Sequence, residues 1–193
     1  MDAWKQKKSL MKGTKYVTTL SPMEREVLGT LTSTVSEALI KRCQSAPKDE
    51  LAELTGMPSG HKDAPEDPSL ARLLPDFERA GDEEYEGDNQ LLRSLHENDI
   101  CRGKLTNLQV INQALGPTGS VNVAVAPDEL DAWVQGLNDL RLYLAAGEVT
   151  GGPDAEQQRS ELVAWLAYCQ GTLVDAAMGQ LPDDVHDAGR PDT

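Results

Sequence analysis

Apolar residues recur at three- and four-residue intervals along much of this chain, and that spacing constrains the fold more than any other feature. It is clearest in one segment, whose apolar side chains share a face: Leu130, Trp133, Val134, Leu137, Leu140 and Leu144. A face of this kind predicts an amphipathic helix that packs against other helices. The chain has 193 residues, enough for one domain with a sizeable core and too few for two full ones.

The same spacing and the local end signals predict most of the other elements. Ser21, Pro22 and Glu24 form a capping-box start for a helix that runs to about Gln44. Further helices are expected at 49–54, at 69–74, from Pro127 to about 147, and from 153 to about 179. A helix capped by Asp88 or Asn89 and a helix at 100–115 are expected between them, either separate or continuous. Residues 15–20 and 121–125 have strand patterns and are expected to pair. We therefore expect a mainly α fold, a helical bundle of about five main helices with a small two-stranded β-ribbon.

Composition marks the two ends and the longer loops. Residues 1–13 are expected to form a basic flexible arm, and residues 180–193 a disordered acidic tail. Between them, residues 14–179 are expected to form a single α-rich domain. Glycine, proline and acidic residues predict an exposed loop at 56–68 and an acidic loop at 81–87.

The charge of the chain is strongly acidic and unevenly distributed. Its formal net charge is −14. The first fifteen residues nevertheless carry about +4, because they contain only one acidic residue and five lysines: Lys5, Lys7, Lys8, Lys12 and Lys15. The rest, at about −18, repels phosphate backbones and anionic lipid. The basic residues are then solvated, or contact nucleic acid or an acidic partner, or fold back onto the acidic body.

Three cysteines are the candidate redox residues. Cys43, Cys101 and Cys169 each continue an apolar stripe on a predicted helix. They are either small core residues or, where two of these helices face each other, a pair within reach of a disulfide. Cys43 is the best candidate for a single reactive thiol because Lys41 and Arg42 adjoin it.

No residue pattern predicts catalysis or metal binding. His61, His96 and His186 are scattered without ligand spacing, so no metal is expected. Phosphate-binding loops and an orderly Ser-His-Asp arrangement are absent from the sequence, and we expect neither a cofactor nor an enzyme.

A polar group interrupts the apolar helix at 130–144. It consists of Asn138, Asp139 and Arg141, of which Asn138 and Arg141 are spaced to touch. This group is either a structural polar network or a partner-facing patch with Arg141 as its anchor.

Several short motifs, in order, carry a resemblance to a known family. They are Tyr16-Val17 after a basic start, Ser21-Pro22, Leu73-Leu74-Pro75-Asp76, Asn138-Asp139-Leu140-Arg141, and Ala164-Trp165-Leu166. In these the chain resembles the actinobacterial family of unknown-function proteins that includes the oxidative-stress regulator AosR, often encoded beside a protease adaptor. The resemblance implies a small intracellular regulator without catalytic residues, with a redox-responsive branch linked to an alternative sigma factor.

Residues and resemblance together lead to one expected function. We expect a non-enzymatic regulatory protein that acts through protein–protein contacts as a redox-responsive, transcription-associated regulator, with an RNA polymerase sigma factor as candidate partner. The alternatives are a DNA-binding regulator that uses the basic arm and an accessory factor in regulated proteolysis. Because no segment resembles a secretory signal or a membrane span, we expect a cytoplasmic protein.

Overall fold

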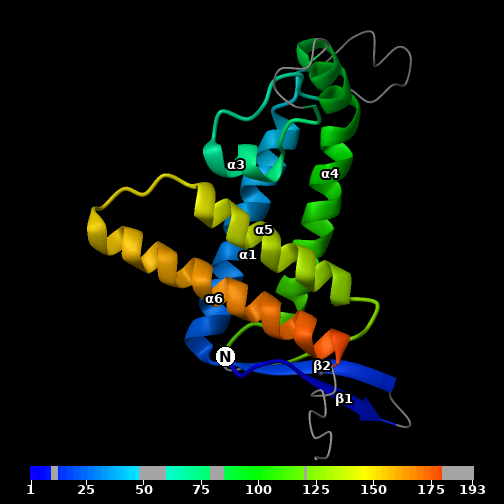
Figure 1. The fold of residues 1–193 in the computed structure, drawn as a ribbon, viewed down its shortest axis with the longest axis vertical. Helices are drawn as coiled ribbons and strands as arrows, with labels where there is room; N and C mark the ends of the chain where they lie inside the picture. Colours follow the sequence, from blue (N-terminus) through cyan, green and yellow to red (C-terminus); the bar gives the residue numbers. More distant parts are fainter. Residues whose placement is uncertain (10–12, 48–59, 79–84, 120, 180–193) are drawn as a thin grey trace, which may run out of the picture.

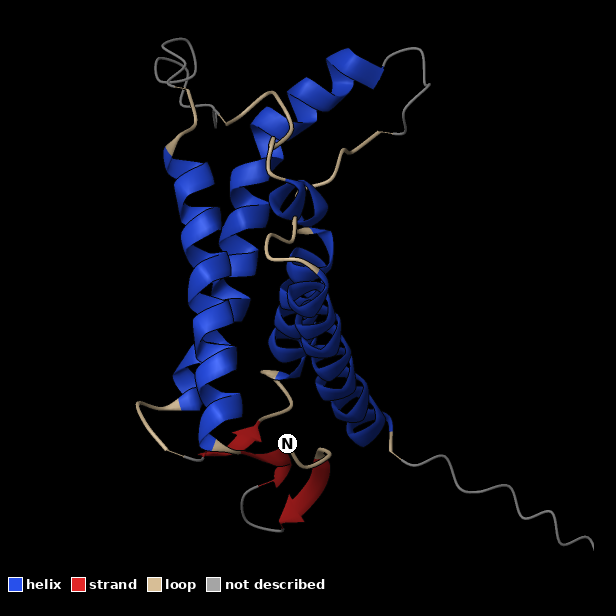
Figure 2. Cartoon of the chain, turned by 90° about the vertical axis from the view of Figure 1, so that its left-hand side faces the viewer, coloured by secondary structure: helices blue, strands red, loops and turns tan. Residues whose placement is uncertain are grey.

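The computed structural model describes residues 1–9, 13–47, 60–78, 85–119 and 121–179. This part of the chain contains five helices and three strands. Figure 1 shows how they are arranged. The helices form the body of the molecule, and the strands lie together at one end of it (Figure 2). The expected mainly α fold is confirmed.

Helix α1, Pro22–Gln44, begins at the predicted capping box. The Ser21 hydroxyl accepts a hydrogen bond from the main-chain N–H of Glu24, and the Glu24 carboxylate accepts one from the N–H of Ser21. These two bonds satisfy main-chain donors that the first turn leaves free. The predicted apolar face points inward, with Leu28, Val35 and Leu39 in the core.

The remaining helices are α3 (Pro68–Leu73), α4 (Tyr85–Leu115), α5 (Leu130–Ala146) and α6 (Pro153–Met178). Helix α4 is one continuous element, and it begins before the expected cap at Asp88 or Asn89. Residues 85–87, expected in the acidic loop, are therefore helical. Helix α5 begins at Leu130 rather than Pro127, because residues 127–129 form the preceding turn.

Three strands form the sheet, not two. Strands β1 (Lys5–Ser9), β2 (Gly13–Leu20) and β3 (Val121–Val125) lie in the order β1-β2-β3. The predicted pairing of β2 with β3 is confirmed; it is antiparallel, with Tyr16 opposite Val125. Strand β1 adds the third strand, with Lys5 opposite Val17.

The first residues therefore differ from the expected flexible arm. The Trp4 ring is buried and contacts the Trp133 ring of α5 edge-on, with ring centroids 5.3 Å apart and planes at 73°. An aromatic side chain of this size supplies several kcal/mol of burial. Trp4 thus anchors the chain, and the pairing of β1 with β2 follows from it. The lysines were compatible with a strand because all five β1 residues are solvent-exposed.

Helix α5 lies at the centre of the packing. It contacts α3, α4 and α6, and it crosses in front of α1 in Figure 1. Trp133, Leu137 and Leu140 of its predicted apolar face are buried in the core. No helix in the described ranges is long and apolar enough to cross a membrane.

Residues 60–67, expected in an exposed loop, are partly buried against the helices. Gly60 and Pro65 are both inaccessible to solvent. A Cβ atom at position 60 would lie 2.9 Å from the main-chain oxygen of Ser94, so this close approach to α4 requires glycine. The rest of that loop before residue 60, the helix expected at 49–54, residues 81–84 and the tail at 180–193 lie outside the described residues.

Candidate functional site

Helix α4 buries a row of polar side chains at four-residue spacing. Asn89, Arg93 and Glu97 occupy three successive turns, Arg93 and Glu97 are 1% and 2% exposed, and Cys101 extends the row by one turn. Leu91, an apolar residue of the same helix, is 57% exposed. The helix is thus turned so that a polar row faces inward, which is stable only if every polar group has a partner.

Asn89 and Arg93, the first two residues of this row, bind the segment that follows α3. Arg93 donates hydrogen bonds to the main-chain oxygens of Leu74, at 3.1 Å, and Pro75, at 3.3 Å. It also forms an ion pair with Asp76, at 2.6 Å. The Asn89 side-chain oxygen accepts the main-chain N–H groups of residues 77 and 78. Residues 74–78 are therefore tied to α4 by polar contacts.

Glu97 lies between two arginines. Its carboxylate accepts hydrogen bonds from Arg93, at 2.7 Å, and from Arg42 of α1, at 2.7 and 3.2 Å. The second guanidinium also donates to the main-chain oxygen of Asp63, and His61 lies 2.8 Å from the main-chain oxygen of Arg42. The C-terminal end of α1 is therefore joined both to α4 and to residues 61–63.

The structure brings two of the three cysteines together at this point. Cys43, half-buried, follows Arg42 on α1, and Cys101, fully buried, follows Glu97 by one turn of α4. The two side chains are near enough for Cys43 to affect the pKa of Cys101. Burial is the largest cause that raises the pKa of Cys101; the contact with Cys43 and the charge of Glu97 raise this pKa further, whereas Arg42 lowers it.

Cys169 is not part of this pair. It is a buried residue of α6, and its sulfur lies 3.4 Å from the sulfur of Met1. Burial raises the pKa of Cys169 to about 12, and the nearby positive amino group of Met1 opposes this effect. Cys169 therefore has the properties of the core residue that its stripe position allowed.

The group Asn138, Asp139 and Arg141 does not form one site. Asp139 is buried and forms an ion pair with Lys104 of α4, at 2.7 Å. Burial raises the pKa of Asp139, and Lys104 opposes this rise. Arg141 donates to the side-chain oxygen of Asn138, at 2.8 Å. These contacts match the structural alternative: Asp139 ties α5 to α4, and the other two residues contact each other.

The basic residues lie on the sheet. Lys5, Lys7 and Lys8 belong to β1, and Lys15 to β2. Lys12 lies outside the described residues. Within those residues, no cluster of three His, Cys, Asp or Glu side chains is arranged to hold a metal ion.

Sequence reasoning missed the arginines and acids around the thiols. Arg93 and Glu97 were not recognised because buried charge does not contribute to an apolar pattern, and Arg42 was identified only as a neighbour of Cys43. One signal was available: Arg93 and Glu97 have the spacing of a helical ion pair, and Cys101 continues it. The partner from α1 lies 55 residues away in the chain, so no local pattern could identify it.

Comparison with known proteins identifies the family. Residues 1–177 match the domain of unknown function DUF2017. The chain belongs to the DUF2017 family. This family assignment confirms the resemblance deduced from the short motifs.

Curated relatives of this DUF2017 protein carry a regulator's name. The chain is 34% identical over 184 residues to the oxidative stress regulator AosR of Mycobacterium tuberculosis and to that of Mycobacterium bovis. Each alignment covers 86% of this chain and 84% of the relative. A relative from Mycobacterium leprae is 31% identical over 183 residues. No solved structure matches the chain. The names of these relatives indicate a regulatory role.

Proposed function

We propose that this protein is a non-enzymatic cytoplasmic regulator that responds to oxidation through Cys43 and Cys101. The observation that carries the proposal is the proximity of these two thiols on different helices: Cys43 follows Arg42, Cys101 follows Glu97 by one turn, and Arg42 and Glu97 form an ion pair at 2.7 Å. Cys43 also raises the pKa of Cys101. The relatives named as oxidative stress regulators support a redox input. Two adjacent thiols are also the minimum needed for a reversible disulfide.

The exposure of the two thiols assigns them different roles. Cys43 is half-buried and can be reached by a small hydroperoxide, whereas Cys101 is fully buried. The positive charge of Arg42, next to Cys43 in the chain, favours an anion nearby. Cys43 is therefore the thiol that reacts first, and Cys101 is the thiol that resolves the product.

The chemistry balances with a hydroperoxide as oxidant. The Cys43 sulfur attacks one peroxide oxygen, the O–O bond breaks, and a sulfenic acid and one water (for an alkyl peroxide, one alcohol) are formed. The Cys101 sulfur then attacks the Cys43 sulfur, the S–S bond forms and the S–O bond breaks. The oxygen leaves as water with the proton of the Cys101 thiol. Two thiols are oxidised and one peroxide is reduced.

The disulfide would act on the contacts that surround it. Cys43 adjoins Arg42, and Cys101 lies one turn from Glu97. A covalent bond between the two cysteines would therefore change the geometry of the ion pair that joins α1 to α4. The same Glu97 contacts Arg93, which holds residues 74–78. Through these contacts, oxidation would move residues 74–78 and so change the surface to which a protein partner binds. An RNA polymerase sigma factor remains the candidate partner because of the family resemblance.

Peptide mapping after mild peroxide treatment tests the proposal. We expect one stoichiometric crosslink between Cys43 and Cys101, reversed by reductant, with Cys169 as a free thiol. Cys43→Ser and Cys101→Ser should each abolish it, and Cys169→Ser should leave it intact. Three unmodified thiols in the wild type, or a crosslink that involves Cys169, would refute the proposed sensor.

A binding measurement tests the output. The affinity for a candidate sigma factor should change on oxidation of the wild type and remain constant in Cys43→Ser. An equal change in both proteins would show that the thiol pair does not control the contact.

A further inference from the structure

The sheet has one face that none of the described helices covers. Along β2 and β3, the side chains of Tyr16, Leu20 and Val123 are buried toward the helices. The intervening side chains point the other way because successive residues of a strand alternate in direction. This outward face consists of Lys15, Val17, Thr19, Asn122 and Ala124.

Strand β1 adds two lysines to this face. Lys5 lies opposite Val17, and Lys7 lies opposite Lys15, so Lys5 and Lys7 share the outward face. Lys8 lies opposite Thr14, and its side chain therefore points to the other side of the sheet. Three ammonium groups of the basic segment are thus gathered on one surface.

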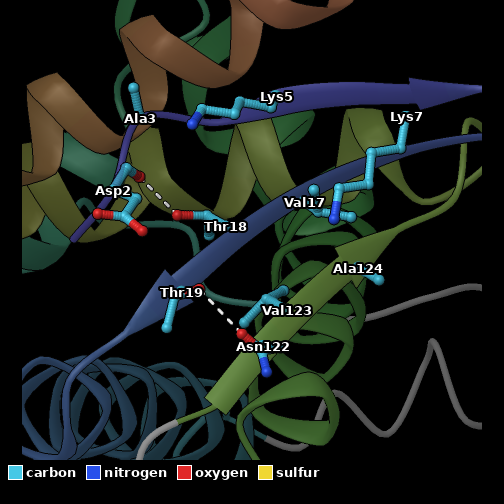
Figure 3. A pocket seen from close by; sticks show the side chains of 10 residues that line it. All are labelled: Asp2, Ala3, Lys5, Lys7, Val17, Thr18, Thr19, Asn122, Val123 and Ala124. Carbon is cyan, nitrogen blue, oxygen red and sulfur yellow. Dashed lines mark hydrogen bonds between the residues drawn. The ribbon is translucent and has the colours of Figure 1, made fainter.

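The outward face is hollowed. A depression of about 500 Å³ is lined by residues from all three strands (Figure 3). Val17, Thr19 and Ala124 contribute small side chains to it, and Lys7 extends from β1 across β2 toward Val17. The hollow therefore combines a shallow floor of small side chains with basic groups along one side.

The lysines on this face form no ion pair within the described residues, and the acidic side chain that lines the hollow is that of Asp2. Lys7 and Lys15 are direct cross-strand neighbours, and like charges in that position destabilise a sheet. No ion pair to Lys5, Lys7 or Lys15 is formed by any part of the chain that the structure describes. In a chain of net charge −14, this concentration of positive charge favours an anionic ligand.

We propose that the outward face of the three-stranded sheet binds an extended acidic segment of a partner protein. Lys5 and Lys7 are two residues apart, which places them roughly 7 Å apart along the strand. Carboxylates at alternate positions of an extended peptide have the same spacing.

Nucleic acid fits this face less well. The residues that line the hollow include no aromatic side chain on which a base could stack. A duplex would also bring a dense row of phosphates close to a body of about −18. A single acidic peptide carries fewer charges and contacts only the basic face.

The test uses a fluorescent twelve-residue peptide of alternating aspartate and alanine, and the same peptide with asparagine in place of aspartate. We expect saturable binding of the acidic peptide to the full chain at low salt, weakening as salt rises, and no binding of the asparagine peptide. Lys7→Glu should weaken binding by about tenfold. Lys8→Glu is the matched control, because it makes the same charge change on the adjacent residue of the same strand but on the opposite face, and it should change affinity less than about twofold.

Three results would overturn the proposal. One is no saturable binding of the acidic peptide; another is an equal loss in Lys7→Glu and Lys8→Glu. The third is either that duplex DNA binds more tightly than the acidic peptide or that the chain self-associates, with Lys7→Glu abolishing that interaction. Either result would show that the face binds something other than an acidic peptide. The proposal does not rest on the thiol pair, and Cys43→Ser should bind the acidic peptide as the wild type does.

Discussion

At the scale of single residues, burial and charge distinguish the three cysteines more clearly than their sequence positions. All three continue apolar stripes, yet only Cys43 is half-buried, and Cys101 and Cys169 are inaccessible. A buried thiol in apolar surroundings ionises at higher pH, and the thiolate is the reactive species. Reactivity is therefore expected to follow the environment of each thiol.

Alkylation with iodoacetamide near pH 8 checks this expectation. Cys43 should react first, and Cys101 and Cys169 should react much more slowly in the folded protein. Since the pKa of Cys169 is about 12, its thiolate fraction and its rate should rise roughly tenfold per pH unit below that value. Equal rates for Cys43 and Cys169 in the native protein, measured by mass spectrometry, would contradict the assignment.

Glu97 is the residue on which the buried ion network depends. Glu97→Gln keeps the shape of the side chain but removes the charge that the buried Arg93 and the partly buried Arg42 share. We expect the free energy of unfolding to fall by about 3–5 kcal/mol, measured by urea denaturation. Asp99→Asn is the control on the same helix, because Asp99 and its partner Arg102 are both exposed. It should change stability by less than about 1 kcal/mol; an equal effect of both changes would contradict a special role for Glu97.

At the scale of elements, the first strand shows how one side chain decides whether a basic segment is ordered. The lysines of β1 are compatible with a solvated arm or with an exposed strand. Trp4 distinguishes the two, because its ring packs on Trp133 and brings the next five residues beside β2. The sheet and its basic outward face therefore depend on a contact between the start of the chain and α5.

Trp4→Ala tests that dependence. Loss of a buried aromatic ring should lower the free energy of unfolding by about 3–5 kcal/mol. Hydrogen exchange of the β1 main-chain amides should become faster at the same time. Lys8→Ala, an exposed change on the same strand, should alter stability by less than about 0.5 kcal/mol. A wild-type melting curve for Trp4→Ala would mean that residues 1–9 form an arm.

At the scale of the whole molecule, oxidation would crosslink residues 43 and 101 and so close the chain between them into a covalent loop. A disulfide reduces the conformational entropy of the unfolded chain, and for a loop of this length the chain-entropy relation corresponds to about 4 kcal/mol. The peroxide-treated protein should therefore unfold at higher urea than the reduced protein. Cys43→Ser, treated identically, should show no such shift, and a lower midpoint for the oxidised wild type would indicate that the crosslink distorts the native packing.

The sequence alone determined the features that depend on near neighbours. The capping box at Ser21 and Glu24, the apolar face of α5 and the strand character of residues 16–20 and 121–125 follow from periodicity and local hydrogen-bonding chemistry. These signals extend over only a few residues, so they can be recognised in the sequence without the structure.

Only the tertiary structure decided which buried polar groups meet. Arg93 and Glu97 of the polar row on α4 have partners from residues 74–76 and from α1, and Cys43 lies near Cys101 on another helix. An apolar pattern indicates which face of a helix packs in the hydrophobic core. It does not identify charged residues that are buried because they form ion pairs. The candidate site thus contains buried charged residues of α4 that the apolar pattern could not identify. Their partners lie far away in the chain.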